Sequence, residues 1–503
     1  MKVTNHRQVL GHPAGIFLIF STEIWERFSY YGMRGLLVLF LSSATLEGGF
    51  GWTAGRALEV YAAYTAIVYI APIIGGYIAD RWLGRRRAVI LGSMLMMAGH
   101  FTMVIPGIAP ALVEWSTGYP VYAVLHESGI VLGEMSISPA AVTAMADYSL
   151  AQGWGPLNEG AVTATYLAMA WAFFLALFLI IAGSGFFKPN MAIMVGELYV
   201  ITDPRRDAGY TVYYMGANIG AFAANLVAGT IGEVYGWHYG FSVAGLGMAI
   251  GLATFLYYSP KLMEGIGERP VYQRAQRPPL TPDERLRVLG ILLMSMFTIV
   301  FWMGFEQGGG LLNLVVRDSV DREIVGFEVP VTWFQSLNPM FIFLFAPLFV
   351  ALWGLLARRG IDLHPTRKYA ISLSLMAASF GLLTLAYAEI ERTGSCSAWW
   401  LVGVFAVQTA AELAISPVSK ALVSRYAPKQ IASPLMGAEF LCYAIGAWLA
   451  GQVGAWALDT DPSKAFIFLL LASLATAALC LLLRPVVDRL LEGRAVAWPL
   501  RFK

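Results

Sequence analysis

The chain consists of long apolar segments that follow one another almost from end to end. A helix needs roughly 20 mostly apolar residues to cross the hydrocarbon core of a bilayer. Twelve segments reach about that length, near 15–42, 57–79, 87–107, 161–187, 209–230, 238–258, 287–315, 331–357, 368–390, 398–424, 432–456 and 464–487. Only 13% of the residues are charged, whereas soluble domains carry about 25%. The pattern therefore predicts an all-α membrane protein with about twelve transmembrane helices.

Positively charged residues gather in alternate loops between these segments. Loops rich in Lys and Arg remain on the cytoplasmic side of a membrane. Here they follow the second, fourth, sixth, eighth and tenth segments, at Arg81, Arg85, Arg86, Arg87, Arg205, Arg206, Arg269, Arg274, Arg277, Arg285, Arg358, Arg359, Arg367, Lys368, Arg425 and Lys429. We therefore predict a multi-pass protein of the inner cell membrane, with an even number of spans and both termini in the cytoplasm.

The stretch 108–160 has no Lys or Arg, yet it contains a further apolar run at 121–146. One additional crossing there would place every later basic loop outside the cell. The run is also interrupted by polar residues and a proline, at His126, Glu127, Glu134 and Pro139. We therefore predict that 108–160 is an external insertion, partly helical and lying against the body of the protein.

A segment rich in proline and charge, 259–286, separates the apolar segments into two groups of six. Within it, Thr281-Pro282-Asp283-Glu284 has the pattern of a capping box that opens a helix. We predict an N-terminal six-helix bundle over 1–258, a cytoplasmic linker over 259–286 and a C-terminal six-helix bundle over 287–503. Carriers of this design move two pseudo-equivalent bundles around a central site.

Charged residues inside the apolar segments indicate where function lies. They are Glu23, Glu26, Arg27, Arg34, Lys188, Glu306 and Glu412. Each would cost roughly 2.5–3.5 kcal/mol at mid-bilayer if it faced lipid, so such residues normally face a polar cavity and pair with one another. In the first segment, helical spacing places Glu23, Arg27, Tyr30 and Arg34 on one face. A structural role, in which the charges only neutralise each other, is the alternative.

The signs of these charges favour a zwitterionic substrate carried with protons. Cations and anions come from both predicted bundles, so a cavity between them would offer one positive and one negative pole. A carboxylate that loses a cationic neighbour takes up a proton more readily. The arrangement needs no cofactor, and protons would be the coupling ion.

The sequence offers little for other classes of function. It contains no Ser/His/Asp set, zinc motif or phosphate-binding loop, so we do not expect an enzyme. Cys396, Cys442 and Cys480 are scattered and predict neither a disulfide framework nor a metal site. The net charge of +2 does not indicate a nucleic-acid partner. The expected partners are a small zwitterionic solute, protons and the lipid bilayer.

Several motifs together resemble the proton-dependent oligopeptide transporter family of the major facilitator superfamily. The first segment reads Glu23-Ile24-Trp25-Glu26-Arg27-Phe28-Ser29-Tyr30-Tyr31, which is similar to that family's ExxERFxYY motif. Further matches follow in order: GGYIADRWLGRRR at 75–87, FFKPN at 186–190, DAGYTVYYMGANIG at 207–220, FWMGFEQ at 301–307, FQSLNP at 334–339 and ELAISP at 412–417. The resemblance covers nearly all of the chain outside 108–160 and 259–286. It implies a major facilitator fold and proton-coupled import of di- and tripeptides by alternating access.

The resemblance also implies roles for individual residues. The expected proton-coupling residues are Glu23, Glu26, Arg27, Lys188, Glu306 and Glu412, and Glu306 would alternate between a free state and a pair with Arg34. Arg34 and Lys188 would lie near the carboxyl end of the peptide, with Asn218, Asn338 and Glu412 near its amino end. The pocket would be lined by Tyr30, Tyr31, Tyr69 and Trp302, and Ser416 would touch substrate. For each aromatic the alternative is packing or interfacial anchoring, and for Ser416 it is a bond to its own helix.

Three features depart from the family pattern. Glu439 replaces the Trp of a MGxWF stretch, in Met436-Gly437-Ala438-Glu439-Phe440, and puts a carboxylate near the expected substrate-facing surface. The linker 259–286 is too short for the two additional helices found in many bacterial members, and the insertion 108–160 is unusual. Glu439 keeps open a second function, transport of another small solute such as a drug or an anion. A non-transporting sensor is a third.

Overall fold

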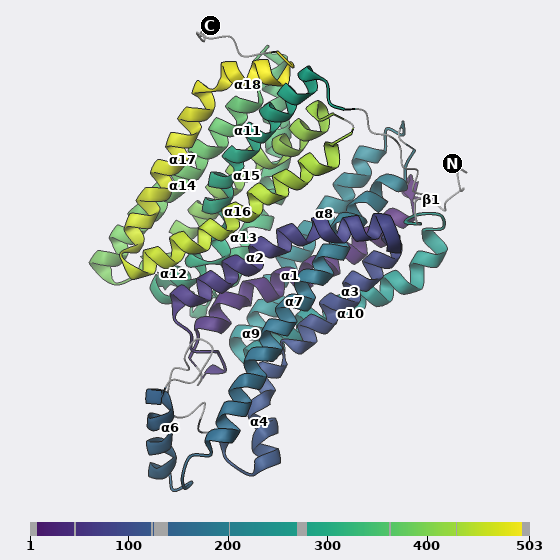
Figure 1. Ribbon diagram of the computed structural model, residues 1–503. Coiled ribbons are helices and arrows are strands. Elements are labelled where there is room, and N and C mark those ends of the chain that lie inside the picture. The colour runs from purple at the N-terminus through teal and green to yellow at the C-terminus, as the bar shows by residue number, and fades with distance from the viewer. Residues whose placement is uncertain are drawn as a thin grey trace. The chain divides into compact units, whose positions relative to one another are not determined.

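The computed structural model describes residues 8–44, 47–121, 124, 139–200, 202–268, 279–361, 364–428 and 430–494. Within these ranges the regular structure is almost entirely helical (Figure 1), which confirms the predicted fold class. The strands form three two-residue pairs: β1 (Gln8–Val9) with β2 (His12–Pro13), β4 (Glu323–Ile324) with β5 (Phe327–Glu328), both antiparallel, and β3 (Val320–Asp321) with β6 (Cys396–Ser397), parallel. Some residues used for the predictions lie outside the described ranges, namely His126, Glu127, Glu134, Arg269, Arg274, Arg277 and Lys429.

Each of the twelve predicted segments corresponds to one helix or to consecutive helices, and Pro139–Ala151 forms a further helix outside them. Up to residue 262 these are α1 (Gly15–Ser42), α2 (Ala54–Ile78), η2 (Ala79–Leu83), α3 (Arg85–Thr102), α4 (Ile105–Thr117), α6 (Pro139–Ala151), α7 (Glu159–Glu197), α8 (Arg206–Ala224), η3 (Asn225–Gly229), α9 (Thr230–Tyr235) and α10 (Trp237–Leu262). From residue 282 they are α11 (Pro282–Phe305), η4 (Glu306–Gly309), α12 (Leu311–Ser319), α13 (Trp333–Arg358), α14 (Pro365–Thr393), α15 (Ala398–Tyr426), α16 (Ala432–Asp459), α17 (Pro462–Leu482) and α18 (Arg484–Leu491). The capping box predicted at Thr281 and Glu284 opens α11.

Nine helices in the described part of the chain are long and apolar enough to cross a membrane, and the bent pair α3 and α4 makes a tenth. Helix α1 is not among them, although it is 28 residues long. Its four charged residues, Glu23, Glu26, Arg27 and Arg34, put more than two charges into every window of 18 residues. The fifth predicted segment, 209–230, is not among them either, so hydropathy alone misses two of the twelve predicted spans.

The prediction that the third segment is one continuous helix is wrong. It was expected as one run over 87–107, but α3 ends at Thr102 and α4 starts at Ile105, with a bend of 51° between them. Pro106 lies in the first turn of α4, where its missing N–H costs nothing. In a continuous helix Pro106 would have no N–H to donate to the carbonyl oxygen of Thr102, and its ring would clash with that carbonyl, so the proline accounts for the break.

The stretch 108–160 contains the rest of α4, helix α6 and the start of α7. Helices α4 and α6 lie at one end of α7 (Figure 1). They pack there around a small apolar cluster of Val121, Val124, Met145, Ala161, Val162 and Tyr166. The described part of this stretch is therefore partly helical, as predicted, and it has a hydrophobic core of its own with the first turns of α7.

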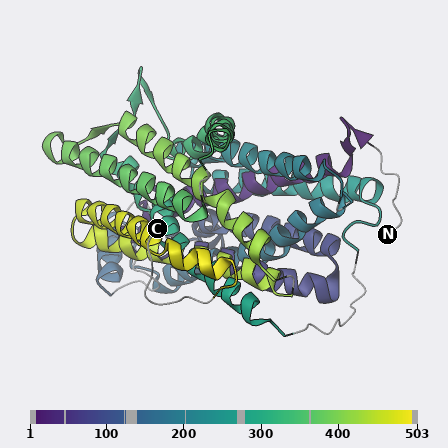
Figure 2. The ribbon, with the colours of Figure 1, turned by 90° about the horizontal axis from the view of Figure 1, so that it is seen from above.

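The chain divides into two compact units. The first comprises 1–64, 71–271 and 330–336, and the second 65–70, 272–329 and 337–503. In the first, α1 packs against α8 and α10, and α3 against α7; in the second, α14 packs between α15 and α17, and α11 against α16. The β4–β5 hairpin of the second unit projects away from its helices (Figure 2). The predicted boundaries at 258 and 287 remain a prediction.

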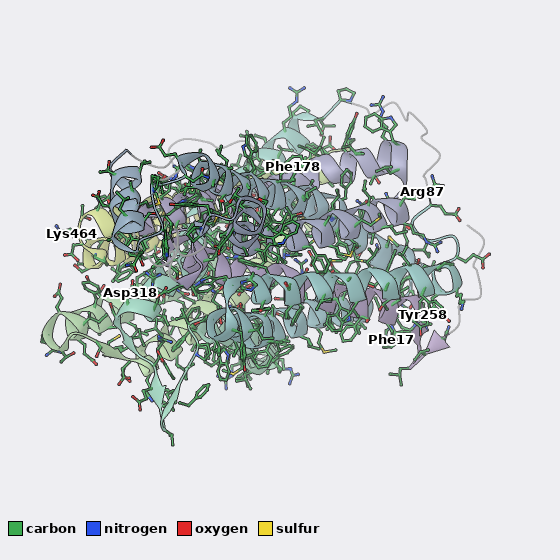
Figure 3. All side chains as sticks on the ribbon, turned by 90° about the horizontal axis from the view of Figure 1, so that it is seen from below. Phe17, Arg87, Phe178, Tyr258, Asp318 and Lys464 are labelled. Carbon is green, nitrogen blue, oxygen red and sulfur yellow. The ribbon has the colours of Figure 1, made fainter. Side chains whose placement is uncertain are left out.

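Glycine allows the helices of the first unit to approach closely. A Cβ atom on Gly75 would lie 2.1 Å from the carbonyl oxygen of Gly185, so neither α2 nor α7 tolerates a larger residue there. Large apolar side chains cover the outside instead: Phe178 on α7 is 64% exposed and projects from the surface (Figure 3). Such a face is suited to lipid contact.

A carboxylate fixes the beginning of α13 within the first unit. Glu233 on α9 accepts hydrogen bonds from the backbone N–H groups of Val331 and Thr332, at 2.8 and 2.9 Å. The hydroxyl of Thr332 donates to the same carboxylate at 2.6 Å. Because free N–H groups and the positive end of the helix dipole favour an anion, Glu233 acts as a cap for α13.

Candidate functional site

The first unit holds a group of buried charges on α1. Arg27 donates from Nε to Oε1 of Glu23 at 2.8 Å and lies 3.4 Å from Oε2 of Glu26. Both carboxylate side chains are fully buried, and Arg27 is 16% exposed. One guanidinium therefore lies between two carboxylates, with the i,i+4 spacing of Glu23 and Arg27 that the sequence predicts.

Helix α8 closes one side of this group. A Cβ atom on Gly220 would lie 2.3 Å from the carbonyl oxygen of Ile24 and 2.9 Å from Cβ of Arg27. The two helices thus meet backbone to backbone beside the charges. From the same helix, Tyr213 brings its hydroxyl next to Glu23. The sequence prediction did not include Tyr213, although it lies inside the matched segment 207–220.

Helix α7 brings Lys188 to the same place. Its ammonium nitrogen lies 3.8 Å from the centre of the Tyr30 ring, in a cation–π contact. It is also close enough to Glu23, Glu26 and Arg27 for electrostatic interaction. The structure thus brings four of the predicted coupling residues together in one unit.

Arg34 lies at the other end of the charged stripe on α1. Its Nε donates to the hydroxyl of Tyr61 at 2.8 Å, and its guanidinium faces the rings of Tyr31 and Tyr61. Tyr61 was missed in the sequence. It precedes Tyr69 by eight residues on α2, just over two helical turns, so helical spacing from Tyr69 could have found it.

Asn218 in the first unit is occupied by its own helix. Its side-chain nitrogen donates to the carbonyl oxygen of Tyr214 at 2.9 Å. The predicted role of Asn218 stays a prediction.

The second unit contains a buried carboxylate held by an aromatic group. Glu306 begins the short helix η4, is 1% exposed, and accepts a hydrogen bond from the hydroxyl of Tyr443 on α16. The Tyr443 ring packs on two other rings, and its centre lies 3.6 Å from that of Tyr69 and 4.0 Å from that of Trp302. Residues Tyr69, Trp302 and Glu306 were predicted, whereas Tyr443 was not.

A second polar pair lies between α13 and α15 of the same unit. The side-chain nitrogen of Asn338 donates to Oε2 of Glu412 at 2.9 Å and is 3.1 Å from the Thr409 hydroxyl. The resemblance implied that Asn338 and Glu412 both lie near the amino end of the peptide, which stays a prediction, and Thr409, one turn before Glu412, was not predicted. Ser416 contributes its carbonyl oxygen to a bond from Ser419.

Glu439 is buried in α16. Its side chain is 8% exposed, and among the described residues no hydrogen-bond partner reaches its Oε2 atom. The hydroxyls of Ser295 and Ser419 lie beside the carboxylate, and Lys420 is the nearest cation. A carboxylate with one unsatisfied oxygen is costly at such a position.

The predicted site residues thus form separate groups within the two units. The first contains Glu23, Glu26, Arg27, Tyr30, Tyr31, Arg34 and Lys188. The second contains Tyr69, Trp302, Glu306, Asn338 and Glu412. Pairing of Glu306 with Arg34 stays a prediction. In the described residues, no cluster of three or more His, Cys, Asp or Glu could hold a metal ion.

Comparison with known proteins agrees with the motifs in the sequence. A peptide transporter of Yersinia enterocolitica, YePEPT, is 28% identical over 97% of this chain and 97% of its own. A di-/tripeptide transporter of Lactococcus lactis subsp. cremoris is 28% identical over 88% of this chain and 89% of its own. A crystal structure of a point mutant of the peptide transporter POT in complex with alafosfalin is similar, with a TM-score of 0.79, 28% identity and 97% coverage of both chains.

The family model described as the POT family matches residues 86–264 and 270–464. These ranges include α7 with Lys188, η4 with Glu306 and α15 with Glu412. The similar solved structure covers α1 and its charged group as well. The chain therefore belongs to the POT family.

Proposed function

We propose that this protein is a symporter of the inner cell membrane that imports di- and tripeptides together with protons by alternating access. The main support is the charged group of the first unit. Two fully buried carboxylates, one guanidinium and one ammonium lie together on α1 and α7. Such an arrangement is costly in a bilayer and is normally kept for function.

The chemistry of both groups fits a zwitterionic peptide. Arg34 and Lys188 would bind its carboxylate, and Arg34 is positioned for this by Tyr61. Asn338 and Glu412 would bind its ammonium group, with Glu412 already held by a hydrogen bond. Transporters of peptides among the relatives support the same substrate class.

Proton coupling would use the same charged residues. Glu23 and Glu26 compete for one guanidinium, so a shift of Arg27 or Lys188 changes how well each carboxylate is neutralised. A carboxylate that loses its cation binds a proton, and one that regains it releases the proton. No cofactor takes part in this scheme. Both termini would lie in the cytoplasm, as the basic loops indicate.

Uptake into proteoliposomes tests the proposal. An inward proton gradient should drive accumulation of a labelled dipeptide, and Lys188→Ala or Arg27→Ala should abolish it. The matched control is Lys464→Ala, because Lys464 is exposed at the start of α17. A potential of 100 mV adds about 2.3 kcal/mol per charge moved, so an inside-negative voltage should accelerate uptake. Unchanged gradient-driven uptake in both Lys188→Ala and Arg27→Ala would overturn the mechanism.

Competition separates peptides from other solutes. Unlabelled di- and tripeptides should displace the labelled dipeptide, and drugs or inorganic anions should not. If an anion or a drug proves to be the better substrate and dipeptides fail to displace it, the peptide assignment is wrong.

A further inference from the structure

Tyr443 on α16 makes two different contacts in the second unit. Its hydroxyl donates a hydrogen bond to Oε1 of Glu306. Its ring lies between two other rings, 3.6 Å from the centre of Tyr69 and 4.0 Å from that of Trp302. The planes are tilted by only 29° and 37°. One side chain therefore connects a buried carboxylate to an aromatic pair.

The spacing of α11 and η4 makes this double contact possible. Trp302 and Glu306 are four residues apart, so they lie one above the other on the same helical face, about 6 Å along the axis. A tyrosine is long enough to pack its ring on the first and reach the second with its hydroxyl. Phenylalanine would retain only the ring contact, and serine at that position would retain neither.

The backbones of α11 and α16 hold Tyr443 in this place. A Cβ atom on Gly446 would lie 2.7 Å from the carbonyl oxygen of Ile299 and 2.8 Å from Cβ of Trp302. Further along, the side chain of Gln307 donates to the carbonyl oxygen of Ala450 at 2.9 Å. Residues 443, 446 and 450 step by three and four, so they lie on one face of α16. The direction from which Tyr443 approaches Glu306 is thus fixed by close backbone packing.

The third participant, Tyr69, comes from α2. Its segment 65–70 belongs to the second unit, whereas the remainder of α2 belongs to the first. The ring of Tyr443 is therefore clamped by one residue of α11 and one residue of this segment. Movement of the α2 segment would remove one side of the clamp and free the tyrosine to turn away from Glu306.

We propose that Tyr443 is a positioning residue for proton coupling, one that holds Glu306 only while the α2 segment 65–70 clamps its ring. The inference rests on the proposed function of the chain as a proton-coupled peptide carrier. With the clamp closed, the Tyr443 hydroxyl fixes the orientation of the Glu306 carboxylate. With the clamp open, the carboxylate is free to exchange its partner or bind a proton.

Two transport assays on the same proteoliposomes separate this role from simple packing. Counterflow measures exchange of labelled for unlabelled dipeptide without a proton gradient, whereas gradient-driven uptake requires coupling. Tyr443→Phe keeps the ring and loses only the hydroxyl, so we expect counterflow within twofold of wild type and gradient-driven uptake reduced at least tenfold. Tyr69→Leu removes one side of the clamp and should reduce gradient-driven uptake in the same way.

The matched control is Tyr387→Phe. Tyr387 lies on α14 of the same unit, where its ring packs on Phe466. This variant should leave both assays unchanged. If gradient-driven uptake by Tyr443→Phe equals that of the wild type, Tyr443 does not have this role. The same follows if the variant loses gradient-driven uptake and counterflow equally. Absence of gradient-driven uptake in the wild-type protein itself would instead overturn the proposed function.

Discussion

Replacing Arg27 by methionine tests how the buried charges on α1 are balanced. Methionine keeps much of the side-chain length and the helix propensity of arginine, so the change mainly removes the cation. Glu23 and Glu26 would remain fully buried, without the guanidinium that now lies 2.8 and 3.4 Å from them. Lys188 would be left as the nearby cation.

The structure sets the size of the effect. At an effective dielectric constant of 20, a pair of unit charges separated by 2.8 Å attracts by roughly 6 kcal/mol. Part of this attraction offsets desolvation, and breaking a buried pair by removing one partner costs about 3–5 kcal/mol. For a unit of this size, each kcal/mol lost from the free energy of unfolding lowers the melting temperature by about 2 °C. Arg27→Met should therefore lower the melting temperature by roughly 6–10 °C.

Thermal unfolding in detergent, followed by circular dichroism, measures this shift. The control is Arg56→Met, because Arg56 forms an exposed pair with Glu59 at 3.0 Å whose removal should cost at most about 1 kcal/mol. The double variant Glu23→Gln, Arg27→Met removes one carboxylate together with the cation and leaves Glu26 with Lys188 as its counter-charge, so it should recover most of the loss. If Arg27→Met melts like Arg56→Met, or if the double variant is no better than Arg27→Met, the charges are not balanced as described.

Two further changes probe other parts of the fold. Glu233→Gln removes the charge that caps α13 through Val331 and Thr332, so it should lower the free energy of unfolding by about 1–3 kcal/mol. The control Glu328→Gln, at an exposed position of the hairpin, should leave the free energy of unfolding unchanged. Equal melting temperatures for the two variants would contradict the cap. Glu439→Met removes a buried carboxylate with one unpartnered oxygen, so it should raise stability by roughly 1–3 kcal/mol in the same unfolding assay. A large loss of stability would show that Glu439 is satisfied by its neighbours.

The sequence was sufficient for the features that depend on local pattern. Apolar length located the long helices, because the bilayer imposes a minimum length on each span. The four-residue spacing of Glu23 and Arg27 predicted their ion pair. The helix boundaries at Pro106 and at the capping box of Thr281 follow local rules as well, although the first was overlooked.

Features that depend on contacts between distant segments could not be predicted in this way. Tyr443 is 137 residues from Glu306, and nothing near it in the sequence distinguishes it from the other tyrosines of an aromatic-rich chain. Tyr213 and Thr409 were missed for the same reason, whereas helical spacing from Tyr69 could have found Tyr61. The close approach of Gly220 to α1 also becomes visible only when both helices are placed.

The most direct test of proton-coupled peptide import is the proton flux that accompanies the peptide. Proteoliposomes would contain a pH-sensitive dye, with equal pH on both sides and the membrane potential clamped at an inside-negative value. Addition of an external dipeptide should acidify the interior of vesicles that contain the wild-type protein, and should not do so with Arg27→Ala. Entry of labelled peptide without any acidification would contradict the account.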